Sequence, residues 1–226
     1  MIFPLFLCKT KQFFMENLKQ QMINIMLKNG IIKTNFVHPF TLKSGIKSPI
    51  YCNLREIMAY PYLLKLVISS FKEQFVNGGL FDVIMGVHSG AAVYADCLAY
   101  VLWRPLAYVR PDVKAHGLKK QIEGASVLGK SIFLIEDVIS TGGSIINDAE
   151  IILKAGATSV SCHSIFSYEM EKAKEEFANA SLSYSSLLTI QDVLLELKET
   201  GNTGYEILKS WFTDPKNWFK TWFPKV

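Results

Sequence analysis

The sequence predicts an α/β fold with a mostly parallel sheet flanked by helices. From residue 81 to residue 167, short apolar runs of strand length alternate with stretches of helical periodicity. That alternation is typical of βαβ units. The apolar runs are nearly continuous, which indicates strands buried on both faces. Half of the residues are hydrophobic, so we expect a sizeable packed core.

The N-terminal part predicts a helix that begins at Met15 and ends at Gly30. Its apolar face follows helical spacing: Leu18, Met22, Ile25 and Met26. Because a clean helix starts at Met15, natural translation could start there too, which makes residues 1–14 an uncertain extension. The order of apolar and basic residues before Met15 is wrong for a secretory signal.

A hairpin and a second helix come next. The stretch "FTLKSGIKSPIYCN", residues 40–53, predicts a hairpin in which "FTL" and "IYCN" are strands joined by a Ser-Gly turn. Pro61 begins a helix that Gly78 and Gly79 end. One face of that helix is apolar: Leu64, Val67, Ile68, Phe71 and Phe75.

The core elements then follow in a regular order. The predicted strands are "FDVIMGV" (81–87), "PLAYVR" (105–110), "SIFLI" (131–135) and "SVSCHSIFS" (159–167). The predicted helices are "GAAVYADCLAYVL" (90–102) and "SIINDAEIILKAG" (144–156). No internal repeat and no low-complexity segment interrupts them.

Composition excludes several classes of protein. The formal net charge of +4 suits a phosphate pocket but is too weak and dispersed for nucleic acid. The four cysteines form no C-x-x-C pair, which favours reduced thiols in the cytoplasm. No apolar run reaches the roughly 18 residues of a membrane helix. Three of the four tryptophans lie in the tail 201–226, for which packing on the core or a second subunit is favoured over membrane contact.

A polar loop at residues 110–130 breaks the regular pattern. A loop of this length between core strands is functional or disordered. Its cations would suit an anionic ligand, although a solvated loop would also be rich in lysine. They are Arg110, Lys114, His116, Lys119 and Lys120.

The stretch "SIFLIEDVISTGGSII", residues 131–146, predicts a binding site where a buried strand ends. Glu136 and Asp137 follow the apolar run, where bare carboxylates are costly unless a polar partner meets them. Ligands of open parallel sheets bind at this end of the strands. The glycines of "STGGS", residues 140–144, let backbone N–H groups approach an oxygen, and a helix N-terminus follows.

These groups suit a ribose 5-phosphate. The N–H groups would hold the phosphate together with the hydroxyls of Ser140, Thr141 and Ser144. The two carboxylates would repel the phosphate and accept hydrogen bonds from the diol of the sugar. The alternative is a tight strand-to-helix turn with an acidic N-cap and no ligand.

Three segments resemble the orotate phosphoribosyltransferases, which belong to the type I phosphoribosyltransferases. "FLIEDVISTGGSI", residues 133–145, is similar to the phosphoribosyl-diphosphate (PRPP) motif of the type I enzymes. "FTLKSGIKSPIYCNLR", residues 40–55, resembles the N-terminal segment of the orotate enzymes, and "YVRPDVKAHGLKKQIEG", residues 108–124, their mobile catalytic loop. Together the motifs cover roughly residues 15–200.

The resemblance implies a type I phosphoribosyltransferase fold with a small N-terminal hood of one helix and short strands. It divides the chain into an uncertain extension (1–14), a helix and hood segment (15–60), the transferase core (61–200) and the aromatic tail (201–226). It also implies a homodimer that shares the 110–124 loop between subunits.

The implied reaction transfers ribose 5-phosphate from PRPP to orotate, giving orotidine 5'-phosphate and pyrophosphate on the route to UMP. Mg²⁺ would arrive bound to the substrate diphosphate, so no protein metal ligand is assigned. The expected partners are these small molecules and a second copy of the chain, with no nucleic acid and no membrane. The expected location is the cytoplasm.

The resemblance assigns residues to the site in two groups. The catalytic residues would be Arg110, Lys114, His116 and Asp137. The substrate-binding residues would be Lys43, Tyr51, Glu136, Asp137, Val138, Ile139, Ser140, Thr141, Gly142, Gly143 and Ser144. The segment "GVHSG", residues 86–90, would bind pyrophosphate, and Ile50 would flank the base with Tyr51, which could equally be a core aromatic.

Some positions depart from the family pattern. Pro111 and Ser89 stand where many relatives have lysines, and Tyr168 stands where some have an arginine for the orotate carboxylate. Arg55 is our hypothesis for that last function. The competing explanation is that Arg55 pairs with Glu56 or with solvent.

Other functions stay open at this point. The sugar-phosphate motif alone does not exclude a purine or another pyrimidine base. A regulator of the same fold could sense PRPP while binding nucleic acid, although it would not need a cationic loop. A fused decarboxylase is excluded by length, because too few residues follow the core for a barrel domain.

Overall fold

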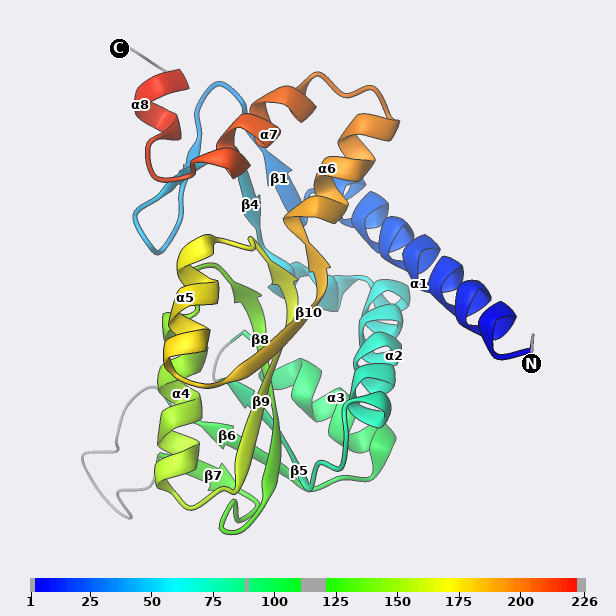
Figure 1. The fold of residues 1–226 in the computed structure, drawn as a ribbon, viewed down its shortest axis with the longest axis vertical. Helices are drawn as coiled ribbons and strands as arrows, with labels where there is room; N and C mark the ends of the chain where they lie inside the picture. The colour runs from blue at the N-terminus through cyan, green and yellow to red at the C-terminus, as the bar shows by residue number, and fades with distance from the viewer. Residues whose placement is uncertain (1–2, 88–89, 111–120, 223–226) are drawn as a thin grey trace. The chain divides into compact units, whose positions relative to one another are not determined.

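The computed structural model describes residues 3–87, 90–110 and 121–222, with the side chains of the first helix from Met15 onwards. The chain divides into two compact units (Figure 1). One comprises residues 67–187, and the other comprises residues 1–66 together with residues 188–226. Among the described residues, no helix has both the length and the apolar character of a membrane span.

The unit of residues 67–187 is built on a six-stranded sheet in the order β10-β9-β8-β5-β6-β7. Its strands are β5 (Val83–Val87), β6 (Leu106–Val109), β7 (Ile122–Gly124), β8 (Ser131–Ile139), β9 (Ser159–Ser167) and β10 (Ser183–Thr189). The central pairs β6-β5, β5-β8 and β8-β9 are parallel, whereas β7 pairs antiparallel to β6. The predicted α/β class and the mostly parallel sheet are therefore confirmed.

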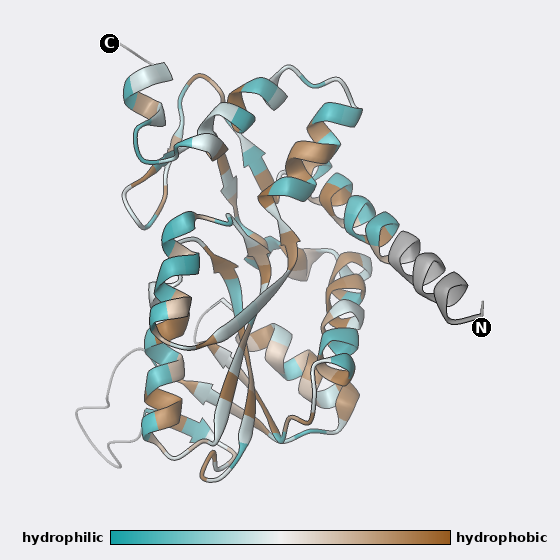
Figure 2. Cartoon of the chain, viewed as in Figure 1, coloured by the Kyte–Doolittle hydropathy of each residue, from teal (hydrophilic) through white to brown (hydrophobic). Residues whose placement is uncertain are grey.

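Helices cover both faces of this sheet (Figure 1). They are α2 (Pro61–Asn77), whose later part belongs to this unit, α3 (Ala92–Leu102), α4 (Gly143–Lys154) and α5 (Glu171–Asn179). On one face, α4 and α5 pack their apolar side chains on the sheet; on the other, α3 and α2 do so. Figure 2 shows hydrophobic and hydrophilic residues alternating along α4 and α5, as amphipathic helices require.

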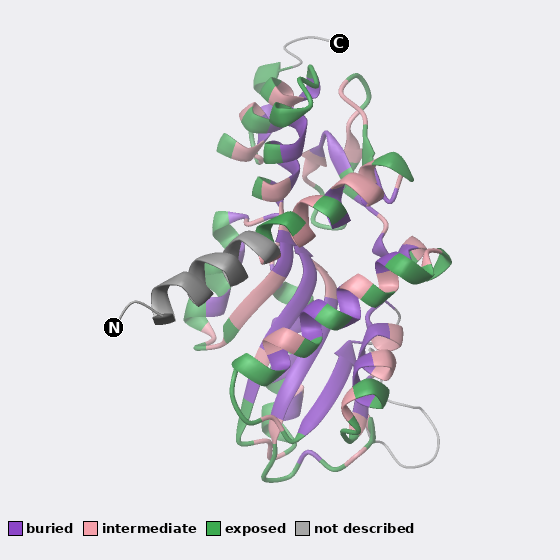
Figure 3. Cartoon of the chain, turned by 90° about the vertical axis from the view of Figure 1, so that its right-hand side faces the viewer, coloured by how far each residue is buried: buried purple, intermediate pink, exposed green. Residues whose placement is uncertain are grey.

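The two sides of the core are filled by alternate residues of each strand, because successive side chains point to opposite faces of a sheet. Met85 and Leu134 are fully buried in a cluster with the inner face of α4, including Ala149. On the opposite face, Phe133 meets Phe71 of α2 edge-on, with ring centroids 6.3 Å apart. The central strands β5, β8 and β9 are accordingly buried along most of their length (Figure 3).

The other unit contains both chain ends. Its elements are α1 (Phe3–Lys28), β1 (Ile32–Thr34), β2 (Phe40–Thr41), β3 (Lys47–Ser48), β4 (Ile50–Cys52), the 3-10 helix η1 (Leu54–Ala59), the start of α2, α6 (Ile190–Glu199), α7 (Gly204–Thr213) and α8 (Trp218–Trp222). The first helix begins at Phe3 rather than at Met15. Pro4 in its first turn is compatible with a helix start.

The predicted hairpin differs in its pairing. The strand β2 pairs with β3, so that Phe40 lies opposite Ser48, while β4 pairs with β1. Pro49 explains the difference, because it has no backbone N–H to extend the β2–β3 ladder. Its carbonyl instead accepts a hydrogen bond from the N–H of Asn35, at 2.8 Å.

The aromatic tail packs within this unit. The indole N–H of Trp211 donates to the carbonyl of Lys47 at 2.7 Å, and the indole N–H of Trp218 donates to Ser210 Oγ at 2.9 Å. Both indoles are buried. A buried indole with its N–H satisfied gains the full benefit of removing a large apolar ring from water.

Within the sheet unit, β9 carries a buried histidine. His163 stacks on Phe133 at a centroid distance of 3.6 Å, and its Nδ1 lies 2.9 Å from Ser185 Oγ. Its Nε2 has no hydrogen-bond partner among the described residues. Burial lowers the pKa of His163 to about 3, because the charged ring would lose its hydration.

We expect His163 to make folding sensitive to acid. The unfolded histidine binds a proton near its ordinary pKa of about 6.5, whereas the folded one resists protonation down to about 3. The free energy of unfolding should therefore fall as pH drops below 6.5, by up to about 1.4 kcal/mol per pH unit.

Urea unfolding between pH 7.5 and pH 5 measures this slope, and His163→Gln should flatten it. The control is His38→Gln, at an exposed histidine, which should keep the wild-type slope. Equal slopes for His163→Gln and wild type would contradict the assignment.

Candidate active site

The two acids lie inside β8 and not beyond its end. The prediction that the strand ends at Ile135 is wrong, because β8 continues to Ile139. The ladder with β9 continues through the acidic pair, with Glu136 opposite Ser164 and Val138 opposite Phe166. Main-chain hydrogen bonding therefore holds the acids in an extended strand at the edge where the site was predicted.

Successive side chains leave a strand on opposite faces, yet the carboxyl groups of Glu136 and Asp137 lie close enough to share a hydrogen bond. Glu136 is only 8% exposed, and its nearest charged groups besides Asp137 include Asp148 of α4. Asp137 is half-buried and contacts Gly90, which precedes α3. The pair thus forms one acidic group near the end of the strand, with Glu136 buried and Asp137 half-buried.

Burial raises the pKa of Glu136 well above its usual range, and the neighbouring charge of Asp137 raises it further. Asp148 adds to the effect. The same environment raises the pKa of the Cys162 thiol to about 12, chiefly through burial and then through Glu136 and Asp148. A carboxyl group in this setting retains a proton more readily than an exposed one, so it can donate as well as accept a hydrogen bond.

Asp137 is oriented by the backbone around it. Its Oδ1 accepts a hydrogen bond from the N–H of Val138 at 2.9 Å. Its Oδ2 lies so close to Gly90 that a Cβ built on that glycine would be 2.2 Å away. Only a residue without a side chain can stand at position 90 while the carboxylate keeps this orientation.

The chain after β8 turns into α4 at the place where the phosphate cradle was predicted. The helix α4 begins at Gly143, one residue before the predicted start, and its N-cap Gly142 has φ 82°, a left-handed conformation that glycine adopts without strain. Because Gly142 has no side chain to cap the helix, the N–H groups of the first turn need another acceptor. Gly143 and Ser144 are exposed, and the helix dipole places partial positive charge there.

The predicted catalytic loop rises from an antiparallel pair of strands. Val109 of β6 lies opposite Ile122 of β7, and the N–H of Arg110 donates to the carbonyl of Gln121 at 2.8 Å. The guanidinium of Arg110 forms an ion pair with Glu123 at 2.7 Å. This pairing holds the predicted cation at the base of the loop.

Several predicted residues lie outside the described residues, so the structure gives no position for them. They are Ser89, Pro111, Lys114, His116, Lys119 and Lys120.

The hood residues belong to the other compact unit. Lys43 is exposed in the turn between β2 and β3. Tyr51 of β4 is 41% exposed, and its ring lies 5.8 Å from that of Phe40. Arg55 is exposed in η1, and the carboxylate of the next residue, Glu56, accepts a hydrogen bond from Asn53 and pairs with Lys33.

Two features of the site were not predicted from sequence. One is the contact of Gly90 with Asp137, since residue 90 was considered only as part of a pyrophosphate loop. The other is Asp148 beside Glu136. Helical spacing could have indicated it, because Asp148 falls on the same face of α4 as Ile145 and Ile152, both of which are buried.

Two other observations restrict which residues can belong to the site. Tyr168 is buried and meets Phe166 edge-on at 5.3 Å, so it is a core aromatic and not an exposed anion-binding group. Within the described residues, no three His, Cys, Asp or Glu side chains form a group that could hold a metal ion.

Comparisons with known proteins agree with the predicted family. The phosphoribosyl transferase domain family matches residues 54–188. An orotate phosphoribosyltransferase from Oceanobacillus iheyensis is 38% identical over 84% of this chain and 94% of its own. One from Fusobacterium nucleatum is 38% identical over 86% of this chain and 95% of its own.

Solved structures share the fold. An orotate phosphoribosyltransferase from Aeropyrum pernix, 26% identical, gives a TM-score of 0.66 over 80% of this chain and 98% of its own. The UMP synthase of Leishmania donovani gives 0.74 over 86% of this chain, which covers only 42% of that longer protein. An adenine phosphoribosyltransferase from Leishmania donovani gives 0.59 at 18% identity, so the fold alone does not identify the base.

We expect Gly90→Ala to weaken binding of ribose 5-phosphate at least about tenfold, because the new methyl group would push the Asp137 carboxylate out of place. Isothermal titration calorimetry measures the affinity, and thermal unfolding checks that the fold is retained.

A double-mutant cycle with Asp137→Asn separates this mechanism from a general disturbance. If Gly90 acts through Asp137, the affinity of the double variant for ribose 5-phosphate should be no lower than that of the single variant with the lower affinity. Additive losses would show that Gly90 affects binding by another route.

Proposed function

The chain belongs to the orotate phosphoribosyltransferases of the phosphoribosyltransferase family, and we propose that it transfers ribose 5-phosphate from PRPP to orotate. The products would be orotidine 5'-phosphate and pyrophosphate. The observation that carries the proposal is the order of groups after β8. Half-buried Asp137 is followed within a few residues by the left-handed Gly142 and the exposed N-terminus of α4.

In this mechanism α4 binds the 5-phosphate. The N–H groups of its first turn donate to the phosphate oxygens, and the hydroxyls of Ser140, Thr141 and Ser144 add further donors. The backbone of Val138 and Ile139 carries the chain from the acids to this cradle. These donors are held in position by the helix before the ligand arrives, so no reorganisation is needed during the reaction.

The acids act on the sugar. Displacement at C1 builds positive charge on the ribose, which Asp137 and Glu136 stabilise while they bind its hydroxyls. Arg110, Lys114 and His116 neutralise the negative charge on the departing pyrophosphate. Groups of this kind are each worth about 3 kcal/mol in the transition state.

A Mg²⁺ ion bound to the diphosphate would neutralise part of its charge. The acidic pair Glu136 and Asp137, near the end of β8, suits a site to which the substrate brings a cation. We assign no protein ligand to it. Lys43 and Tyr51 of the hood would meet the orotate.

We further propose that the enzyme is a homodimer in which the 110–124 loop serves the neighbouring subunit, and that it works in the cytoplasm. The three cysteines with described side chains, Cys52, Cys97 and Cys162, form no disulfide among the described residues, which suits a reducing compartment. The likeness of the 108–124 segment to the family's catalytic loop supports the shared loop.

The relatives named as orotate enzymes favour orotate over the other bases. We therefore expect PRPP-dependent consumption of orotate, with adenine, hypoxanthine and uracil consumed at least about a hundredfold more slowly. Absorbance assays with each base measure this. Preference for a base other than orotate would overturn the assignment of substrate while leaving the transferase class intact.

In the same assay, Lys114→Ala should lower kcat/KM at least a hundredfold, roughly 2.7 kcal/mol, because a cation facing the pyrophosphate is lost. Lys72→Ala, at an exposed lysine of α2, is the matched control and should leave the rate unchanged. A loss of about tenfold or less would mean that Lys114 does not act on the leaving group.

We expect Arg55→Ala to raise the KM for orotate about tenfold or more without changing the KM for PRPP, because the orotate carboxylate would lose a charged donor. Lys65→Ala, at an exposed lysine of α2, serves as the control for charge alone. An unchanged KM for orotate would favour the alternative that Arg55 only pairs with nearby groups on the surface.

A further inference from the structure

The hairpin that carries Lys43, formed by β2 and β3 (residues 40–48), is too short to hold itself in place. Each strand contains two residues, and the ladder consists of the pairs Phe40–Ser48 and Thr41–Lys47. An isolated two-stranded hairpin is at best marginally stable in water. Contacts from other parts of the chain must therefore fix the position of this β2–β3 hairpin.

Lys43 lies in the turn at the tip of this hairpin. The N–H of Gly45 donates to the carbonyl of Leu42 at 2.8 Å, and the N–H of Leu42 donates to the carbonyl of Ile46 at 2.9 Å. Gly45 has φ 81°, and the side chain of Leu42 is buried. Because the backbone of the turn is defined in this way, the position of Lys43 follows from the position of the two strands at its base.

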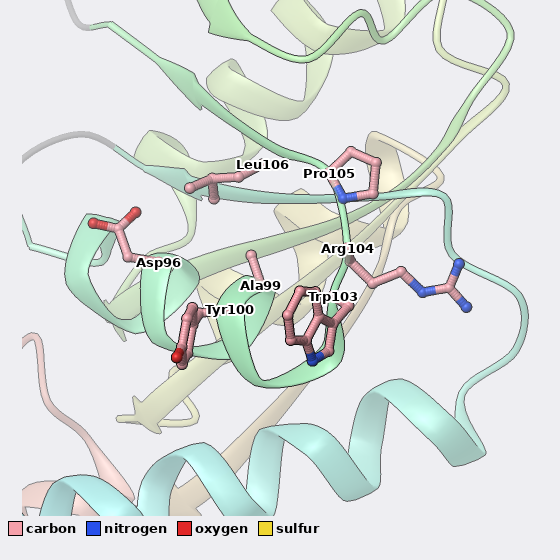
Figure 4. Close-up of a pocket in the computed structure, with 7 residues that line it drawn as sticks. All are labelled: Asp96, Ala99, Tyr100, Trp103, Arg104, Pro105 and Leu106. Atoms are coloured by element: carbon pink, nitrogen blue, oxygen red, sulfur yellow. The ribbon is translucent and has the colours of Figure 1, made fainter.

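Two buried tryptophans of the C-terminal tail belong to the same compact unit as the hairpin. Trp211 of α7 is fully buried, and Trp218 of α8 is 2% exposed. By contrast, Trp103 at the end of α3 is 90% exposed and lines a groove on the surface (Figure 4). A buried indole N–H without an acceptor is costly, so the acceptors of Trp211 and Trp218 are fixed parts of the structure.

Trp211 holds the hairpin through the main chain of Lys47. Its indole N–H donates to the Lys47 carbonyl at 2.7 Å, at the short end of the range for an N–H···O hydrogen bond. The two residues are 164 positions apart in the chain. Lys47 lies opposite Thr41, in the pair of the ladder that is nearer to the turn. The tail therefore holds the hairpin at the end that carries Lys43.

The side chain of Lys47 adds a second connection to the tail. Its ammonium donates to Thr41 Oγ1 at 2.7 Å and lies 5.8 Å from the ring centroid of Phe219 in α8. An ammonium over an aromatic face is attracted by the electrons of the ring. The helix α8 is itself held on α7, because the indole N–H of Trp218 donates to Ser210 Oγ at 2.9 Å. The main chain and the side chain of Lys47 thus both contact the tail.

We propose that Trp211 is a positioning residue for the transfer reaction, which holds the β2–β3 hairpin so that Lys43 meets the orotate. The inference rests on the proposed function, in which Lys43 contacts the orotate, and it gives the C-terminal tail a role in binding the base. Because Trp211 is fully buried, it acts through Lys43 and not by contact with the substrate.

The competing explanation is that Trp211 contributes only to the stability of its unit. A loss of stability lowers the amount of folded enzyme, which reduces the maximal rate and leaves the KM of each substrate unchanged. A displaced Lys43 instead raises the KM for orotate, because the contact that binds the base is weakened. The KM values therefore separate the two explanations.

Trp211→Phe removes the indole N–H and keeps an aromatic ring, so it tests the hydrogen bond with little loss of packing. The KM for orotate should rise at least about fivefold, while the KM for PRPP stays within about twofold of the wild-type value. The matched control is Trp222→Phe, the same substitution at a tail tryptophan that is 44% exposed, which should leave both KM values unchanged.

A double-mutant cycle with Lys43→Ala shows whether the effect of Trp211 passes through Lys43. In the Lys43→Ala background, Trp211→Phe should change the KM for orotate by less than about twofold, because the side chain that it positions is already absent. An equal rise of the KM in both backgrounds would overturn the proposal.

Hydrogen exchange tests the anchoring of the hairpin without any substrate. In Trp211→Phe the amides of residues 40–48 should exchange at least about fivefold faster, while those of β8 exchange at the wild-type rate. The proposal is overturned if exchange in the hairpin is unchanged, or if it is faster and the KM for orotate stays the same. A wild-type chain that does not use orotate would count against the proposed function, and hydrogen exchange would still decide whether Trp211 holds the hairpin.

Discussion

Two carboxylates near the end of a buried strand are the constraint on which the site depends. Glu136 is buried beside Asp137, and no ion pair joins either to a cation among the described residues. Burial is the largest cause of the raised pKa of Glu136, and repulsion by the neighbouring Asp137 charge adds to it. A ligand that brings hydroxyl donors and develops positive charge relieves this repulsion. The site is therefore suited to the cationic transition state of a sugar more than to its neutral ground state.

The positions of these acids depend on a close approach of backbone to side chain. Gly90 leaves room for Asp137 Oδ2, and Gly86 lets α3 pack on β5, where an added Cβ would lie 3.0 Å from Ala92 Cα. In the cradle, a Cβ on Gly142 would lie 3.0 Å from the ring of Phe177. Close packing of this kind fixes atoms to within fractions of an ångström, which is what electrostatic stabilisation of a transition state requires.

The helix α3 contributes to the core, to the surroundings of the site and to the exposed surface. Its inner face fills the core, its start adjoins the residues around Asp137, and its outer face carries Tyr100 and Trp103.

The α/β class, the order of strands and helices and the start of α4 to within one residue could be predicted from sequence, because hydrophobic periodicity and glycines act over short distances. It also predicted that Glu136, Asp137 and the "STGGS" turn lie together, and the structure places them in sequence at the end of β8 and the start of α4. Strand pairing was harder to predict from sequence. The strand β2 pairs with β3 and not with β4, because Pro49 interrupts the ladder and because pairing depends on which strands lie nearby.

The groups that surround the acids could not be predicted from sequence, because they come together only when the chain packs. Asp148 reaches Glu136 from α4, and Gly90 reaches Asp137 from the loop before α3, across gaps in sequence that no local pattern spans. The burial that raises the pKa of Glu136 depends on the whole packed unit. Sequence periodicity identifies which faces are apolar, but distances between faces are set only when the chain has packed.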